Sequence, residues 1–220
     1  MRRRFLLSLL ILLAMPLTTR ADEARDQALI RAAAAGDAAA VTTLLAEGAS
    51  VRAKGEGGRT ALLAATRGNH VEAARALIAA GADVNAKDDI QDSPYLYAGA
   101  AGHLEILKLT LAHGADLKST NRYGGTALIP ACERGHVETV STLINAGVDV
   151  NHVNRLGWTG LLEAIILSDG GPRHAEIVRL LLQAKADPNL ADKDGVSPLI
   201  HARQRGYREI ERLLLTAGAR

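Results

Sequence analysis

Short blocks of apolar residues, each opened by a polar residue, recur at one spacing along this chain of 220 residues. Thr or Ser precedes two to three mostly apolar residues at five positions, with steps of 33, 33, 33 and 38 residues: Thr60, Ser93, Thr126, Thr159 and Ser197. Two other series keep the same steps: Gly48, Gly81, Gly114, Gly147, Lys185 and Gly218, and His70, His103, His136, His174 and Tyr207. Three series with one period predict an array of six units.

Within each unit the pattern predicts a short helix, a turn, a second helix and a hairpin. The Thr or Ser is the expected N-cap of the first helix, and Pro94 and Pro198 stand at the first helical position, where proline loses no hydrogen bond. The second helix has apolar residues at helical spacing, as in Ile106, Leu107 and Leu111. The glycines of the second series are expected to end that helix.

Two motifs connect this pattern to a known family. Gly-Ala-Asp-Val-Asn-Ala at residues 81–86 matches the end of the ankyrin repeat, and His-Leu-Glu-Ile at 103–106 matches the start of its second helix. Over about residues 24–220 the chain therefore resembles the ankyrin-repeat family. The resemblance implies an all-α repeat solenoid, an ankyrin-repeat array of about six helix-turn-helix units joined by β-hairpin loops. The units are expected at residues 25–58, 59–91, 92–124, 125–157, 158–195 and 196–220.

The chain departs from the family pattern at one position of each first helix. The His of the family's Thr-Pro-Leu-His motif is replaced by an aliphatic residue in five units: Leu63, Leu96, Ile129, Leu162 and Ile200. We expect apolar packing to replace the hydrogen bonds that this His would make between repeats.

Both ends of the array differ from its middle. The first unit is rich in Ala and has Gln27 where the N-cap Thr is expected, and the last has Glu211 where other units have an apolar core residue. Terminal repeats need a polar outer face. Units one and six are therefore predicted to cap the array.

The first 21 residues have the pattern of a secretory signal peptide. Met1–Arg4 is basic, Phe5–Leu13 is rich in Leu, and Thr19 and Ala21 are small residues at −3 and −1 of a cut before Asp22. The apolar run is about 13 residues, too short to span a bilayer, so no stable membrane insertion is expected. The short basic region is typical of bacteria. We expect residues 1–21 to be removed and the ankyrin-repeat domain of residues 22–220 to be periplasmic.

Two alternatives for the export signal stay open. The run Arg2-Arg3-Arg4-Phe5-Leu6 resembles a twin-arginine signal, although the apolar segment favours the general secretory route. A eukaryotic secretory origin is the second alternative.

Charge and composition argue against several classes of function. Four of the 26 basic residues lie in the first 21 positions, so the remaining chain has 22 basic residues against 24 acidic ones and offers no charge for binding a nucleic acid. The single cysteine, Cys132, excludes an internal disulfide, and its small-residue position predicts a buried, inert thiol.

The repeated histidines do not predict a metal site. Equivalent residues of stacked units lie about 10 Å apart, whereas zinc ligands lie about 2 Å from the metal. We expect these histidines to be hydrogen-bonded in the turn between helices. No catalytic constellation assembles, so the sequence predicts neither an enzyme nor a cofactor. The enzyme alternative requires a site at the insertion of unit five with His174 or His152.

The resemblance implies binding through the hairpin tips and the exposed face of the first helices, which line a concave groove. Trp, Tyr and Arg are the commonest hot-spot residues of interfaces. With each hairpin tip counted in the unit whose helices follow it, the candidate partner-binding residues of units three to five are Ile90, Arg122, Tyr123, Arg134, Arg155, Leu156 and Trp158. Trp158 is expected to be exposed at a tip. The alternative is that these side chains pack on neighbouring hairpins.

The longer step of 38 residues places an insertion in unit five. Gly-Gly-Pro within Ser168–Arg173 predicts a protruding loop, to which we assign no role.

These features predict a monomeric, exported module that binds a protein partner without turnover. Some exported bacterial ankyrin proteins are accessory factors that protect an enzyme such as a catalase, and the layout of this chain is similar to theirs. The alternatives are an immunity protein that neutralises a periplasmic toxin and a structural protein that associates with itself.

Overall fold

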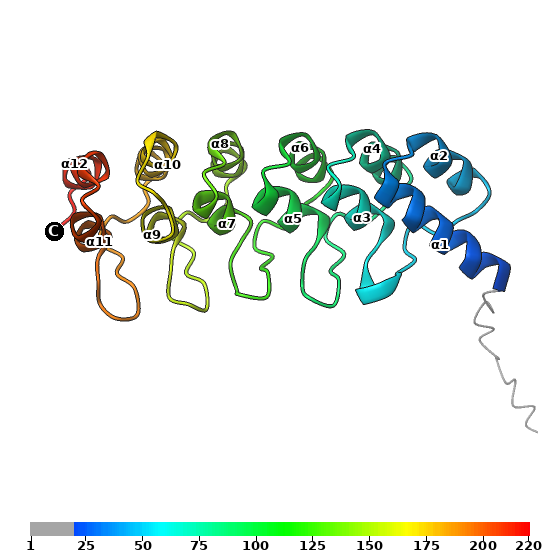
Figure 1. Ribbon diagram of the computed structural model, residues 1–220, viewed down its shortest axis with the longest axis horizontal. Helices are drawn as coiled ribbons and strands as arrows, with labels where there is room; N and C mark the ends of the chain where they lie inside the picture. Colours follow the sequence, from blue (N-terminus) through cyan, green and yellow to red (C-terminus); the bar gives the residue numbers. More distant parts are fainter. Residues whose placement is uncertain (1–19) are drawn as a thin grey trace, which may run out of the picture.

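The computed structural model describes residues 20–220, which form a row of six helix pairs. The first helices of the pairs are α1 (Arg20–Ala35), α3 (Ala61–Arg67), α5 (Pro94–Ala101), α7 (Leu128–Glu133), α9 (Gly160–Ile166) and α11 (Pro198–Arg205). The second helices are α2 (Ala38–Ala46), α4 (Val71–Ala79), α6 (Leu104–Ala112), α8 (Val137–Ala146), α10 (Pro172–Gln183) and α12 (Arg208–Thr216). Each helix packs on its counterpart in the next pair, so the two sets form two layers (Figure 1). The predicted all-α repeat solenoid is confirmed.

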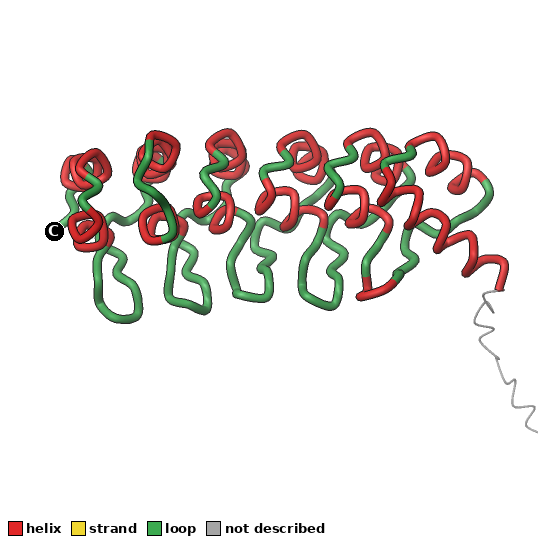
Figure 2. Tube along the Cα trace, viewed as in Figure 1, coloured by secondary structure: helices red, strands yellow, loops and turns green. Residues whose placement is uncertain are grey.

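The loops that join the pairs all project from the layer of first helices (Figure 2). They reverse as hairpins, closed at the tip by backbone hydrogen bonds such as the one from the Asn121 N–H to the Gly125 carbonyl, 2.9 Å. Within residues 20–220 they contain no strand, only a short 3₁₀ turn (Glu56–Gly58) and an isolated bridge between Lys54 and Thr60. The chain reversals of the expected β-hairpins are therefore present without their strands.

The predicted N-caps are present in four units. The side-chain oxygens of Thr60, Ser93, Thr159 and Ser197 each accept a hydrogen bond from the backbone N–H three residues further on. Thr126 is the exception, because α7 begins at Leu128, one residue later than the register predicts, and the buried Thr126 hydroxyl has no hydrogen-bond partner within residues 20–220.

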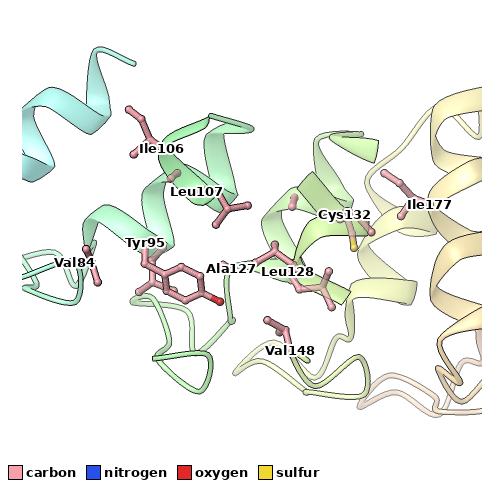
Figure 3. Close-up of a cluster of buried hydrophobic side chains, with 14 of the residues drawn as sticks. Val84, Tyr95, Ile106, Leu107, Ala127, Leu128, Cys132, Val148 and Ile177 are labelled. Carbon is pink, nitrogen blue, oxygen red and sulfur yellow. The ribbon is translucent and has the colours of Figure 1, made fainter. Parts of the chain in front are cut away.

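Small first helices let the units approach closely around an aliphatic core. Tyr95, Leu107 and Leu128 lie in the interior between successive units (Figure 3). Cys132 is fully buried, as predicted, and burial raises the pKa of its thiol. A thiol with a raised pKa is a poor nucleophile at neutral pH.

Apolar packing replaces the family's His in four of the five units. Leu63, Leu96, Ile129 and Leu162 are all buried, whereas Ile200 is exposed. The expectation is therefore wrong for the last unit described, because within residues 20–220 α11 packs on α9 and α12, which leave Ile200 uncovered.

The two ends of the array are polar or extended. Helix α1 has 16 residues, so Gln27 lies inside it rather than at an N-cap. At the other end the guanidinium of Arg203 lies 2.7 Å from the carboxylate of Glu211, which keeps a charged pair at the end of the stack.

Residues 1–19 of the predicted signal peptide lie outside the described residues, and the predicted cut before Asp22 falls in the first turn of α1. None of the helices in residues 20–220 is both long enough and apolar enough to cross a membrane.

The insertion of unit five is not a protruding loop, contrary to the prediction. Pro172 and Arg173 form the first turn of α10, which has 12 residues against nine in α6. The short loop before α10 is attached to the next unit, because the hydroxyl of Tyr207 donates a 2.6 Å hydrogen bond to the carbonyl of Ser168. The ring of Tyr207 also lies so close to Gly170 that a side chain there would collide with it.

Candidate binding groove

A groove of about 440 Å³ lies between three hairpin tips and the helices α5, α7 and α9 that follow them. The tips are those near residues 90, 123 and 156, and the helices present the side that faces the hairpins. The groove therefore runs across units three to five, the part of the array that the sequence singles out.

Four large apolar side chains in this groove are exposed to solvent. Ile90 is 47% exposed, Tyr123 53% and Leu156 41%, and Leu167 at the end of α9 is 47% exposed. Ile90, Tyr123 and Leu156 occupy equivalent positions of successive hairpins and are called the apolar row below. Contiguous exposed apolar surface on a folded domain is typical of an interaction site.

An Asx residue in each hairpin fixes the apolar row. Oδ1 of Asn121 accepts hydrogen bonds from the backbone N–H groups of Tyr123 and Gly125, at 2.9 and 3.1 Å. Asp88 makes the same two bonds ahead of Ile90, as does Asn154 ahead of Leu156. Such side-chain bonds replace the missing strands in holding the tip. These residues were not among the predicted ones, although Asp88, Asn121, Asn154 and Asp192 repeat in the sequence at the common spacing.

The end of the groove near unit three has its charges paired. The guanidinium of Arg67 lies 3.2 Å from Oδ2 of Asp88 and 2.9 Å from Oδ2 of Asp92, and it also stacks over the ring of Tyr97. Arg122 lies 4.0 Å from Asp92 and over the ring of Tyr123. Burial raises the pKa of Asp92 and the charge of Arg67 opposes that shift. This end is a neutralised network with aromatic faces.

The end near unit five is acidic. Glu163 is 5% exposed and its Oε1 accepts a 2.8 Å hydrogen bond from Nδ2 of Asn154. Burial, and then the charge of Glu133, raises the pKa of Glu163 to about 7. Both carboxyl groups line the groove. Near neutral pH this end can hold or release a proton.

Five of the seven predicted partner-binding residues line the groove. These are Ile90, Arg122, Tyr123, Arg134 and Leu156. The guanidinium of Arg134 also donates a 2.9 Å hydrogen bond to the carbonyl of Ala100 in the preceding unit.

The other two residues do not line it. Arg155 packs on the preceding hairpin, where its guanidinium donates a 3.0 Å hydrogen bond to the carbonyl of Arg122 and its stem lies against Gly124. Trp158 is partly buried, so the expectation of an exposed tip is wrong. Its position follows the turn, where the chain runs back into α9 rather than out to the tip.

Two residues of the groove had no signal in the sequence. Tyr97 and Glu163 both stand at the fourth position after the N-cap, which is a buried Ala64 in unit two. Because this repeat position is part of the core in unit two, the sequence does not indicate that its residues line a groove in other units.

Three of the four repeated histidines are hydrogen-bonded, as predicted, and each bond reaches the first helix of the preceding unit. His70 is hydrogen-bonded to the carbonyl of Ala34 and His103 to that of Thr66, each in the preceding first helix. His174 is bonded in the same way to the carbonyl of Glu133. Within residues 20–220 no three His, Cys, Asp or Glu side chains come together as a set that could hold a metal ion.

Comparison with known proteins gives one family. The family model for ankyrin repeats, in three copies, matches residues 6–88 and 95–192. The protein named as ankyrin repeat protein YahD from Escherichia coli (strain K12) is 55% identical over 58 residues, which are 26% of this chain and 29% of YahD. The match thus spans less than a third of that relative.

Two crystal structures resemble the whole array. An ankyrin repeat domain from Acinetobacter baumannii AYE is 67% identical, with a TM-score of 0.85 over 87% of this chain and 98% of that domain. The ankyrin repeat protein EF0377 is 41% identical, with a TM-score of 0.83 over 88% of this chain and 98% of its own.

Proposed function

The chain belongs to the ankyrin-repeat family, whose domains are generally protein-interaction modules, and we propose that it binds a protein partner through the groove of units three to five. One observation carries this proposal: the apolar row and Leu167 expose four large apolar side chains in a single groove. Covering these side chains with a partner would remove their apolar surface from water.

The proposed mechanism is complementarity without turnover. The Asx hydrogen bonds hold the tips that carry the apolar row, and the Arg67 network fixes the neighbouring side chains. A groove whose residues are already held in place loses little conformational entropy on binding. Family members are typically non-enzymatic, and we extend that property to this chain.

We place this function in the bacterial periplasm. The pattern of residues 1–21 supports export, and the bacterial sources of the Acinetobacter and Escherichia relatives support a bacterial envelope. N-terminal sequencing of the protein recovered from a periplasmic fraction tests this: we expect a chain that begins at Asp22. A chain that begins at Met1 in the cytoplasmic fraction would contradict export.

The role that we propose is that of an accessory or protective factor for a resident periplasmic enzyme, such as a catalase. The similarity of layout to exported bacterial ankyrin proteins of that kind supports it. An accessory factor should bind an abundant resident enzyme with moderate affinity. A subnanomolar complex with a toxin would instead identify an immunity protein.

The test is quantitative capture of partners from periplasmic extract by immobilised residues 22–220. Three baits are compared: the unchanged protein, Tyr123→Ala/Leu156→Ala in the groove, and Ile200→Ala/Leu215→Ala. The last pair is a matched control, because Ile200 and Leu215 are exposed apolar residues of α11 and α12 outside the groove. All three baits should have the same helical circular dichroism.

We expect one partner that is retained by the unchanged protein and by the control pair and lost from the groove pair. A partner that survives in the groove pair would move the binding site elsewhere. If no partner is retained and light scattering gives a dimer that the groove pair abolishes, the chain associates with itself instead.

A further inference from the structure

The two ends of the groove differ in how their charges are satisfied. Near unit three, Arg67 is paired with two carboxylates, and Arg122 lies within 4.0 Å of one of them. Near unit five, Glu133 and Glu163 line the groove, and neither takes part in any ion pair formed within residues 20–220. The groove therefore has an acidic end that this chain does not neutralise.

Glu163 is the more unusual of the two carboxylates. It is 5% exposed, and its one hydrogen bond within residues 20–220 is the one that Oε1 accepts from Asn154. Its second oxygen, Oε2, is left without a partner there. Removing a carboxylate from water costs free energy unless a cation and hydrogen bonds compensate it. The raised pKa of Glu163 reflects this cost.

The apolar surroundings of these carboxylates suit one type of side chain. Leu156 and Leu167 are both exposed on the same groove. Lys and Arg side chains combine a hydrocarbon stem, which packs on apolar surface, with a charged end. An acidic side chain would instead meet Glu133 and Glu163 here. At the other end Arg67 is already paired with Asp88 and Asp92, and the guanidinium of Arg134 is bonded to the carbonyl of Ala100.

We propose that the acidic end of the groove receives a lysine or arginine side chain of the protein partner. The cationic group lies between Glu133 and Glu163, and the stem lies on Leu156 and Leu167. Hydrogen bonds between a cation and carboxylates are among the stronger polar contacts. The inference rests on the proposed function, since it names the chemistry that the groove recognises.

A random library of displayed 12-residue peptides tests the inference without knowledge of the natural partner. It is selected on four baits in parallel: the unchanged residues 22–220, Glu133→Gln/Glu163→Gln, Tyr123→Ala/Leu156→Ala, and Glu105→Gln/Glu138→Gln. The last pair is the matched control, because Glu105 and Glu138 are exposed carboxylates in the first turns of α6 and α8, outside this groove. Gln at position 163 keeps an oxygen that can accept from Asn154.

We expect the unchanged protein and the control pair to enrich peptides with a Lys or Arg flanked by apolar residues. For a selected peptide, Glu133→Gln/Glu163→Gln should weaken binding about tenfold or more, and so should replacing the peptide's Arg with neutral citrulline. When the Gln pair and the citrulline peptide are combined, the two losses of affinity should not add, because each substitution removes the same contact.

Two results would overturn the inference in different ways. In the first, the Tyr123→Ala/Leu156→Ala pair loses the selected peptides, but these peptides lack a basic residue or bind the Gln pair as well as the unchanged protein. This result would support binding in the groove and refute the proposal of a basic side chain. Peptides that bind the Tyr123→Ala/Leu156→Ala pair unchanged, or no enriched peptide at all, count against the groove itself and therefore against both proposals.

Discussion

The side-chain amide of Asn154 donates a 2.8 Å hydrogen bond to the carboxyl group of Glu163, which connects a hairpin tip to the helix that follows it. Asp192 and His201, the equivalent residues of unit six, make the same connection over 2.7 Å. The two pairs keep a separation of nine residues. In unit five the helix residue is a buried carboxylic acid, so its ionisation affects both the stability of the unit and the charge of the groove.

Stability should therefore depend on pH through Glu163. Burial and the charge of Glu133 raise its pKa to about 7 in the folded protein, against an ordinary value of 4.5 in the unfolded chain. Between these pH values the folded protein binds a proton that the unfolded chain releases, so the free energy of unfolding falls as the pH rises through this window. Glu163→Gln cannot ionise. We expect it to be more stable than the unchanged protein by roughly 1–3 kcal/mol at pH 8 and equal at pH 4.5.

Guanidinium denaturation at pH 4.5, 6 and 8 measures this difference. Glu138→Gln is the control, because Glu138 is an exposed carboxylate of α8. If the free energies of unfolding of Glu163→Gln and the unchanged protein depended on pH in the same way, the pKa of Glu163 would not be raised in the folded state.

Two equivalent threonines should respond in opposite ways to the same substitution. The hydroxyl of Thr60 accepts a 3.2 Å hydrogen bond from the Leu63 N–H as the N-cap of α3, whereas the buried hydroxyl of Thr126 has no partner within residues 20–220. Thr60→Val should lower the free energy of unfolding by about 1 kcal/mol. Thr126→Val keeps the shape and removes an unsatisfied polar group, so it should be neutral or stabilising by up to about 1 kcal/mol. Urea denaturation at pH 7 compares them, and equal losses would contradict the assignment of caps.

The fold could be predicted from the sequence because its rules are local and repeat. A cap residue, a turn histidine and a terminal glycine each act within a few residues of their own position, so their period reveals the array. Thr126 shows the limit of this reasoning, since nothing near it in the sequence indicates that α7 begins one residue later than the register predicts. The prediction of a protruding loop in unit five was wrong for the same reason, because the loop is hydrogen-bonded to Tyr207, which lies 39 residues away in the sequence.

The groove could be predicted only in part. The apolar row follows from register, because Ile90, Tyr123 and Leu156 are spaced by 33 residues and therefore occupy the same position of successive hairpins. Glu163 and Trp158 depend on how α9 packs against its neighbours, which no local pattern contains. Glu163 lines the groove at a position that is core elsewhere, and Trp158 is partly buried although it is close to a tip.

Removing Arg67 should destabilise the unit-three end of the groove. Its guanidinium is the cation nearest to both Asp88 and Asp92, at 3.2 and 2.9 Å. Arg67→Met leaves two adjacent carboxylates that are mostly shielded from water, so we expect a loss of about 2–3 kcal/mol at pH 7. The loss should shrink towards pH 4, because the pKa of Asp92 is already raised by burial and would rise further without the guanidinium.

The double variant Arg67→Met/Asp92→Asn is the internal control for that experiment. It removes one of the two like charges, so it should recover at least half of the loss at pH 7, as measured by urea denaturation. A double variant as unstable as Arg67→Met would mean that Arg67 acts through its contact with the ring of Tyr97 instead.

The hydrogen bond from Tyr207 to the insertion predicts a local effect on dynamics. The hydroxyl donates over 2.6 Å to the carbonyl of Ser168, in the loop whose Gly170 and Gly171 N–H groups are bonded to loop side chains. Tyr207→Phe keeps the ring against Gly170 and removes only the hydroxyl, so we expect a loss of about 1 kcal/mol in unfolding free energy. Amide hydrogen exchange should become faster at Gly170 and Gly171, and less so in distant units.

Gly170→Ala should lower the free energy of unfolding more than Tyr207→Phe does. Its φ is +66°, which disfavours any side chain, and the added Cβ would lie 2.3 Å from the ring of Tyr207. Tyr97→Phe is the control, because the Tyr97 hydroxyl has no hydrogen bond within residues 20–220 and its loss should leave exchange in the loop unchanged. If Tyr207→Phe also leaves that exchange unchanged, the loop is held by ring packing alone, and the hydroxyl does not contribute to ordering the insertion.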